Sequence, residues 1–200
     1  MEPLGGIGFF GTYIGADAKD SNKNSIYLGV ASLGLPDRDY YVSDDADSKE
    51  KREKYVTHVA KMLGFIGYEG KIATEQAKKI LALETSFAQP MMDRVESRDD
   101  RKSYNPMTVA ALQKLAPSIN WANYFKGIGI TNPQEIIVSQ PKYITSLQTI
   151  LAKKDVDAWK AYLKWTILRR SSSMLSTDIE TANWDFYSKT LRGALKEEYR

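Results

Sequence analysis

The side chains that could carry out chemistry are few in this sequence, and their spacing suits no common catalytic arrangement. His58 is the single histidine among 200 residues, and there is no cysteine. A zinc site built on nitrogen or sulfur ligands needs more of these residues than the sequence supplies. His58 lies beside Val59 and close to Met62 in a helical pattern. We therefore expect it to occupy an ordinary surface or half-buried helix position.

Known catalytic and cofactor motifs are missing from the sequence. There is no GxSxG turn, no HExxH and no Walker A loop, and the glycines from Gly5 to Gly8 lack dinucleotide-loop spacing. From Asp20 onwards, oxygen-bearing residues recur as in a calcium loop, but Ser25 replaces the glycine and Ala31 replaces the bidentate glutamate. A polar turn is the simpler interpretation. The sequence thus predicts no catalytic residue and no metal ligand.

Composition and charge argue against several classes of protein. The net charge is +3, and lysines and arginines alternate with acids, as in DSKEKREK, instead of forming a basic stripe for nucleic acid. No run of about 18 apolar residues is present, so we expect no contact with a membrane from this segment. Hydrophobic residues make up 42% of the chain and charged residues 26%, which is typical of a globular protein.

The sequence pattern predicts a β-hairpin followed by helices as the elements that would position these side chains. Residues 7–17 and 25–33 are rich in β-branched and aromatic residues, and the polar stretch DAKDSNKNS joins them. Later apolar residues recur at helical spacing, with Thr108 as an expected N-cap and Pro141 in a first helical turn. We expect a mainly α fold over residues 1–200: a single, multi-helical domain with a short N-terminal β-hairpin and room for one further strand at EIIVSQP.

The stretch GLPDRDYY, between the hairpin and the first long helix, predicts a stiff corner. Pro36 fixes its own φ and favours an extended conformation in the residue before it, and Asp37 can bond the backbone ahead of it. We expect Arg38 to tie this corner to neighbouring elements, and Tyr40 and Tyr41 to anchor it in an aromatic core. The alternative is that Arg38 or Tyr41 contacts a substrate.

Several motifs in this sequence resemble one protein family, and they occur in the family's order. After DAKDSNKNS and LGLPDRDYY come ALETSFA, RDDRKSYNPMTVAALQKLAPSINWANYF, PKYITSL, YLKWTILRRSSSMLS and FYSKTLRG. Together they resemble the N-terminal region of the neprilysin-like zinc metalloendopeptidases, the family that includes endothelin-converting enzymes and bacterial oligopeptidases. The resemblance covers nearly the whole chain.

The resemblance implies a location for the chemistry. Such enzymes have two mostly helical lobes around a closed cavity, and the zinc, its HExxH helix and a third, glutamate ligand belong to the C-terminal part. None of these occurs here, so no catalytic residue or zinc ligand is carried over, and the parent protein's zinc would be bound outside this chain. We expect a fragment of the non-catalytic lobe, inactive alone, which lines the cavity and limits substrate size.

The resemblance also implies partners and a compartment. The partners would be the C-terminal catalytic lobe of the same protein and peptide substrates, in an extracytoplasmic setting that is periplasmic, secreted or membrane-anchored. The alternative is a free-standing helical module that binds peptides or a protein through its Tyr- and Trp-rich face, without enzymatic activity. An open reading frame that continues beyond Arg200 to an HExxH motif would favour the first hypothesis.

Overall fold

The computed structural model describes residues 8–152 and 155–194, which group into two compact units. The sheet unit comprises Met1–Leu33 and Ser86–Lys154, and the helical unit comprises Gly34–Thr85 and Asp155–Arg200. Each unit is therefore assembled from two separate segments of the chain. A single domain over residues 1–200 stays a prediction, because this grouping does not say whether either unit folds alone.

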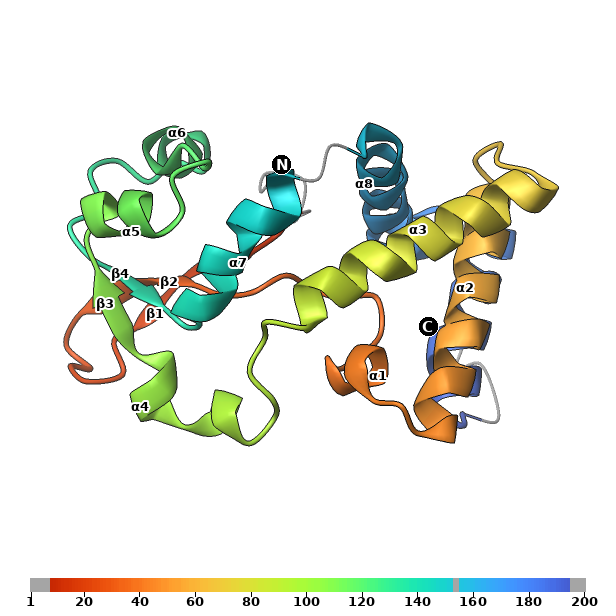
Figure 1. Ribbon diagram of the computed structural model, residues 1–200, viewed down its shortest axis with the longest axis horizontal. Coiled ribbons are helices and arrows are strands. Elements are labelled where there is room, and N and C mark those ends of the chain that lie inside the picture. Colours follow the sequence, from red (N-terminus) through yellow and green to blue (C-terminus); the bar gives the residue numbers. More distant parts are fainter. Residues whose placement is uncertain (1–7, 153–154, 195–200) are drawn as a thin grey trace. The chain divides into compact units, whose positions relative to one another are not determined.

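A small mixed sheet forms the base of the sheet unit, with strand order β1-β2-β4-β3 (Figure 1). Its strands are β1 (Thr12–Ala16), β2 (Asn24–Leu28), β3 (Asn105–Met107) and β4 (Ile136–Val138). β1 and β2 form the expected antiparallel hairpin, which is confirmed. β4 pairs parallel to β2 and antiparallel to β3, and all its residues are buried. The expected extra strand is therefore an interior strand, which fits its unbroken apolar run IIV.

A buried carboxylate, Asp17, holds the turn between β1 and β2. It accepts hydrogen bonds from the Ser25 hydroxyl at 2.6 Å, the Lys19 N–H at 2.8 Å and the Tyr104 hydroxyl at 3.0 Å. These bonds, with Ser25 contributing most, hold the pKa of Asp17 well below its usual range. The stretch DAKDSNKNS is thus the polar turn that the sequence predicted, and the Tyr104 bond ties it to a distant segment.

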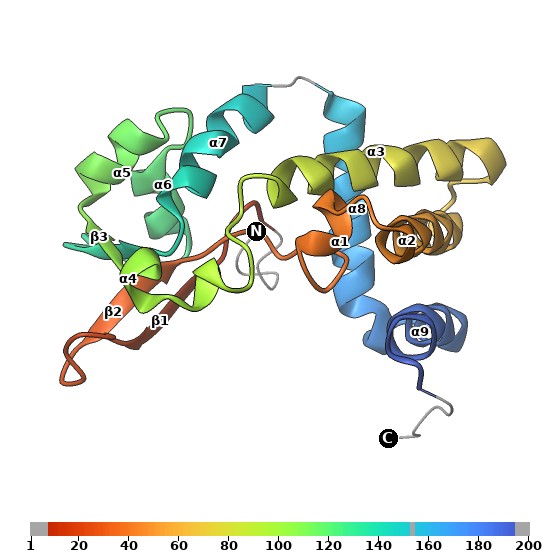
Figure 2. The same cartoon turned by 60° about the horizontal axis from the view of Figure 1, so that its bottom comes forward.

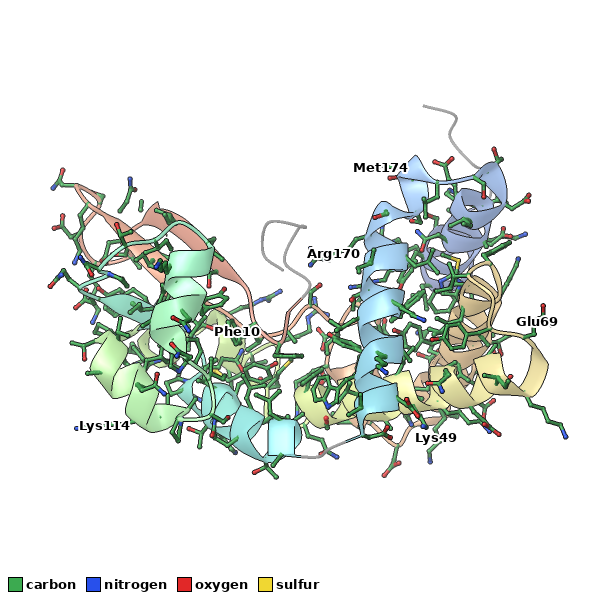
Figure 3. All side chains as sticks on the ribbon, turned by 90° about the horizontal axis from the view of Figure 1, so that it is seen from above. Phe10, Lys49, Glu69, Lys114, Arg170 and Met174 are labelled. Carbon is green, nitrogen blue, oxygen red and sulfur yellow. The ribbon has the colours of Figure 1, made fainter. Side chains whose placement is uncertain are left out.

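Short helices complete the sheet unit, and their ends follow the capping residues in the sequence. They are the 3₁₀ turn Glu96–Arg98, α4 (Asp100–Ser103), α5 (Val109–Leu115), α6 (Trp121–Gly127) and α7 (Pro141–Ala152). Thr108 accepts a hydrogen bond from the Ala111 N–H at 3.1 Å, so the predicted N-cap of α5 is confirmed. Phe10 packs on Trp121 and Tyr124 of α6 and anchors the N-terminal strand region in this unit's core (Figure 3).

Helices alone build the other unit. They are α1 (Asp39–Val42), α2 (Ala46–Gly64), α3 (Gly70–Ala88, whose last residues from Ser86 belong to the sheet unit), α8 (Val156–Ser171), a 3₁₀ turn (Ser172–Met174), α9 (Thr177–Trp184) and a π-helical turn (Asp185–Thr190). α2 packs against α1, α8 and α9 (Figure 2). The mainly α fold is confirmed. In the described segments, no helix is long and apolar enough to cross a bilayer.

His58 belongs to the aromatic core of the helical unit. Its ring stacks on Phe186 with centroids 4.4 Å apart, and it meets Trp165 edge to face at 5.5 Å. Within the described residues, its buried Nε2 atom has no hydrogen-bond partner. Burial lowers the pKa of His58 to about 3, so the ring is neutral at physiological pH. His58 is thus buried more deeply than the surface or half-buried position expected, and it serves as a core aromatic ring.

Replacing His58 with Phe should remove part of the acid sensitivity of folding. The pKa is about 3 in the folded chain against 6.5 for a free histidine, so the unfolded chain takes up the proton first as the pH falls. The wild type should therefore lose stability between these two values, by at most about 1.4 kcal/mol per pH unit. Phenylalanine keeps the stacking but cannot be protonated.

Urea unfolding in steps from pH 7 to pH 4 checks this prediction. The His58→Phe protein should lose less stability on acidification than the wild type. Thr57→Ala, an exposed change on the same helix, is the control and should keep the wild-type loss. Equal losses in the wild type and the His58→Phe protein would contradict the assignment of His58 to the core.

Candidate functional site

The two residues that the sequence marked as candidates for substrate contact lie in the corner that opens the helical unit. Tyr41, in α1, is buried. Arg38 immediately precedes α1, and its side chain is 23% exposed and pairs with Asp39 at 3.1 Å. Asp37 accepts a hydrogen bond from the Asp39 N–H at 3.0 Å, as the sequence predicted for this turn. Of the two candidates, only Arg38 keeps a solvent-accessible side chain.

A fully buried carboxyl group, Glu84 of α3, is the centre of the packing around this corner. The hydroxyls of Tyr41 and Tyr55 both donate hydrogen bonds to its Oε2 atom, at 2.7 and 2.8 Å. The Leu35 N–H donates a hydrogen bond to the same Tyr41 hydroxyl at 2.7 Å. Tyr41 therefore links the backbone of the corner to α3, which confirms its expected role as an anchor in an aromatic core.

Side chains from the second segment of the helical unit complete this arrangement. Trp165 of α8 donates its indole N–H to the Tyr55 hydroxyl at 2.9 Å. Tyr187, in the π-helical turn, donates its hydroxyl to the Gly34 carbonyl at 3.0 Å. Arg169 of α8 contributes a positive charge that acts on both Glu84 and Tyr187. We refer to the following residues as the Glu84 cluster: Tyr41, Tyr55, Glu84, Trp165, Arg169 and Tyr187.

Burial dominates the electrostatics of the Glu84 cluster. It raises the pKa of the Glu84 carboxyl above its usual range, while the positive charge of Arg169 and the hydroxyls of Tyr41 and Tyr55 oppose that rise. Burial, reinforced by the charge of Glu84, also raises the pKa values of both tyrosines well above 10.0. A carboxyl with a raised pKa often marks a catalytic acid. Glu84 has no exposed surface, however, so its arrangement is structural.

Gly34 fits this cluster because no side chain can be placed at its position. A Cβ atom at residue 34 would lie 1.7 Å from the Tyr55 hydroxyl and 2.5 Å from the carbon that bears it. Tyr55 cannot easily move away, since its hydroxyl is held between Glu84 and Trp165. The glycine at the start of GLPDRDYY is thus explained by the close approach of backbone and ring.

The described residues of the two units gather no set of ligands for a metal ion. Across residues 8–152 and 155–194, no group of three or more His, Cys, Asp or Glu side chains converges to hold one. The His58 ring is enclosed by aromatic rings, and the Asp17 carboxylate is occupied by its turn. The buried acids and the one histidine therefore stabilise the fold and do not form a metal site.

Sequence reasoning missed Glu84, although a signal was present. The apolar residues Ile80, Leu83 and Phe87 recur at helical spacing and by themselves would mark the buried face of α3. The structure buries Ile80, Glu84 and Phe87 completely, while Leu83 is only partly buried. Glu84 follows Ile80 by four residues and precedes Phe87 by three, so all three share one helix face. This spacing could have marked Glu84 as a buried carboxyl that is hydrogen-bonded.

Comparison with known proteins finds relatives along the whole chain. The family model described as "Peptidase family M13" matches residues 1–200. Endothelin-converting enzyme 1 of Homo sapiens is 32% identical over 184 residues, which is 89% of this chain and 24% of that protein. The same enzyme of Cavia porcellus gives the same identity and coverage. The chain thus spans about a quarter of the length of the curated relatives it matches.

Solved structures share the fold. The zinc metalloprotease Zmp1 of Mycobacterium tuberculosis, in its open state, superposes with a TM-score of 0.87 at 30% identity. That match covers 96% of this chain and 30% of the Zmp1 chain. PepO of Lactobacillus rhamnosis gives a TM-score of 0.80 at 20% identity over 96% of this chain, which is a likeness of fold. The backbone described above is therefore similar to one part of larger proteins.

Replacing Gly34 with Ala should destabilise the protein, because the new methyl group would collide with Tyr55. Displacing that ring disturbs its hydrogen bonds to Glu84 and Trp165. Overpacking of this kind costs about 1–3 kcal/mol. The midpoint of urea unfolding measures the effect.

Gly64→Ala is the matched control, since nothing lies within 4 Å of a Cβ atom there and the residue ends α2. It should leave the midpoint unchanged or raise it slightly, because alanine is favoured in helices by up to about 1 kcal/mol. If Gly34→Ala is as stable as Gly64→Ala, the close packing of Tyr55 on Gly34 is wrong.

Replacing Glu84 with Gln should change how stability depends on pH. The raised pKa of Glu84 means that its contribution to folding is fully present below 4.5 and is lost as the pH rises through the folded-state value. Glutamine keeps an oxygen for the tyrosine hydroxyls and does not ionise. The free energy of unfolding of the wild type, minus that of Glu84→Gln, should therefore fall from pH 4 to pH 8. A difference that is constant with pH would rule out a raised pKa.

Proposed function

Because this chain belongs to peptidase family M13, we propose that it forms the non-catalytic, cavity-lining lobe of a zinc metalloendopeptidase. In this role it encloses the active site and limits substrates to peptides that can enter the cavity. Its main partner is the C-terminal catalytic lobe of the same protein. The resemblance to neprilysin-like enzymes further suggests an extracytoplasmic setting, either periplasmic, secreted or membrane-anchored.

The main support for this proposal is that the chain matches a peptidase family although its described residues form no metal site. The family model matches all of residues 1–200, whereas the described part of the chain gathers no metal-binding group. The residues present do not fit zinc: there is no cysteine, and the one histidine is stacked in an aromatic core. The zinc of the parent enzyme, which would activate a water molecule for attack on the peptide bond, is therefore assigned to residues outside this chain.

In this role, the chain contributes surfaces that are held rigid by hydrogen bonds within each unit. Glu84 of α3 and Tyr187 of the π-helical turn bond the corner at Gly34–Tyr41, and the bonds of Asp17 fix the hairpin turn. A cavity with rigid surfaces excludes a folded protein, because the protein is too large to enter, and it admits a flexible peptide. In this scheme Tyr41 positions the corner, and the partly exposed Arg38 beside it is the candidate contact for a substrate.

The alternative function is a free-standing helical module that binds a peptide or a protein without enzymatic activity. Exposed apolar side chains on the sheet unit, described below, favour some form of binding. Under this alternative the chain would act without a catalytic lobe. A reading frame that continues beyond Arg200 to an HExxH motif would favour the lobe of a peptidase, and a stop codon there would favour the free-standing module.

A cleavage assay tests the proposed function. One short sequence is presented in two forms, as a free peptide of about ten residues and as a surface loop of a folded protein. The isolated chain should cleave neither form. The chain joined to its catalytic lobe should cleave the peptide and spare the folded protein, because the enclosed cavity excludes it.

The catalytic lobe alone is the control and should lose this discrimination. Chelator-sensitive hydrolysis by the isolated chain would contradict the non-catalytic assignment. Equal cleavage of both forms by the joined protein would contradict the limit on substrate size.

A further inference from the structure

β1 is an edge strand whose outer side has no neighbouring strand in the described part of the chain. The Asp17 N–H bonds the Lys23 carbonyl, and the Gly29 N–H bonds the Gly11 carbonyl, which fixes the pattern of the hairpin. In an antiparallel pair, bonded and non-bonded positions alternate. The backbone groups of Thr12 and Ile14 therefore point away from β2. They present hydrogen-bonding groups at a two-residue spacing, which only an extended polypeptide can match.

This edge lacks the features that normally block strand pairing. The segment TYIGA contains no proline and no charged residue. The opposite edge, β3, has Pro106 at its centre and follows the charged stretch RDDRK. β3 is thus a protected edge, whereas β1 has no such protection at Thr12 and Ile14; at its end, the Ala16 carbonyl accepts a hydrogen bond from the Tyr27 hydroxyl at 3.0 Å.

Apolar side chains flank the open edge on both faces of the sheet. Tyr13 is 59% exposed and Ile14 is 62% exposed, and because they are neighbours in a strand they point to opposite faces. The Tyr13 ring is held flat against Tyr27, with centroids 4.9 Å apart and planes 5° apart. A strand added beside β1 would bring its own side chains against Tyr13 on one face and Ile14 on the other.

We propose that the outer side of β1 binds an extended peptide by strand addition, through the backbone of Thr12 and Ile14 and the side chains of Tyr13 and Ile14. The inference rests on the proposed function, since the peptide belongs to the class that the parent enzyme would cleave. It specifies how such a peptide is held: by its backbone, in an extended conformation, with little dependence on sequence.

The size of the edge favours a peptide over a second copy of the chain. β1 has five residues, so it spans about 17 Å. Two copies paired through this strand would bury far less than the roughly 1,200 Å² of a stable interface. A short edge suits a ligand that binds and leaves, as a substrate must.

Hydrogen–deuterium exchange of the full-length gene product, with chelator present to prevent cleavage, tests this proposal. The probe is a ten-residue peptide of alternating valine and threonine. Its control carries N-methyl groups at every second residue, which removes the N–H groups on one edge. The unmodified peptide should slow exchange at Thr12 and Ile14, and the methylated peptide should not.

Substitutions at residue 14 provide the matched pair. Ile14→Pro removes an N–H that points away from β2, so the hairpin should keep its internal bonds and the melting temperature should change little. Peptide binding should weaken at least about fivefold, which corresponds to one lost hydrogen bond. Ile14→Val keeps both the N–H and an apolar, β-branched side chain and should bind within about twofold of the wild type. If Ile14→Pro fails to fold, the comparison of the two peptides on the wild type decides.

Two results would overturn the proposal. The first is that the peptide does not slow exchange at Thr12 and Ile14. The second is that these amides are already protected without peptide, which would mean that another part of the protein or a second copy covers β1. Binding is measured here without cleavage, so strand addition can succeed or fail independently of peptidase activity.

Discussion

The helical unit depends on one buried carboxyl group. Glu84 has no exposed surface, and placing an acid there is unfavourable unless its oxygens are bonded or its proton is retained. Two tyrosine hydroxyls from α1 and α2 converge on one of its oxygens, and a tryptophan of α8 bonds the second of those hydroxyls. One polar atom thus specifies the arrangement of four helices, which apolar contacts alone would leave less defined.

The two acids that organise this chain illustrate opposite environments. Asp17 accepts several hydrogen bonds beside Lys23, which favours its charged form and holds its pKa low. Glu84 is enclosed by rings, which favours its neutral form and raises its pKa. Each acid nevertheless does the same structural work, because each receives a tyrosine hydroxyl from a distant part of the sequence, Tyr104 and Tyr41 respectively. Neither environment leaves the carboxyl accessible to a ligand.

Local signals in the sequence predicted the helices and strands well. The sequence did not predict features that depend on packing between distant segments. The hairpin, the N-cap at Thr108 and the start of α7 at Pro141 depend on neighbouring residues alone, and all three are confirmed. Periodicity could not decide which side of a helix with many apolar residues is buried. Helical spacing groups Met174 with the apolar residues of this region, yet the structure leaves it 84% exposed in the 3₁₀ turn that follows α8 (Figure 3), whereas Trp165 is fully buried. The Glu84 cluster escaped prediction because its members come from five separate elements: α1, α2, α3, α8 and the π-helical turn.

The discontinuous make-up of the two units has a consequence for synthesis on the ribosome. The segments of the sheet unit are complete once residue 154 has emerged, whereas the helical unit still lacks Asp155–Arg200 at that moment. Until then the Tyr55 hydroxyl lacks the indole N–H of Trp165, and the Gly34 carbonyl lacks the hydroxyl of Tyr187. Glu84 therefore lies in an incomplete core until residues 155–200 have been synthesised, and the helical unit can complete its packing only after that segment has emerged.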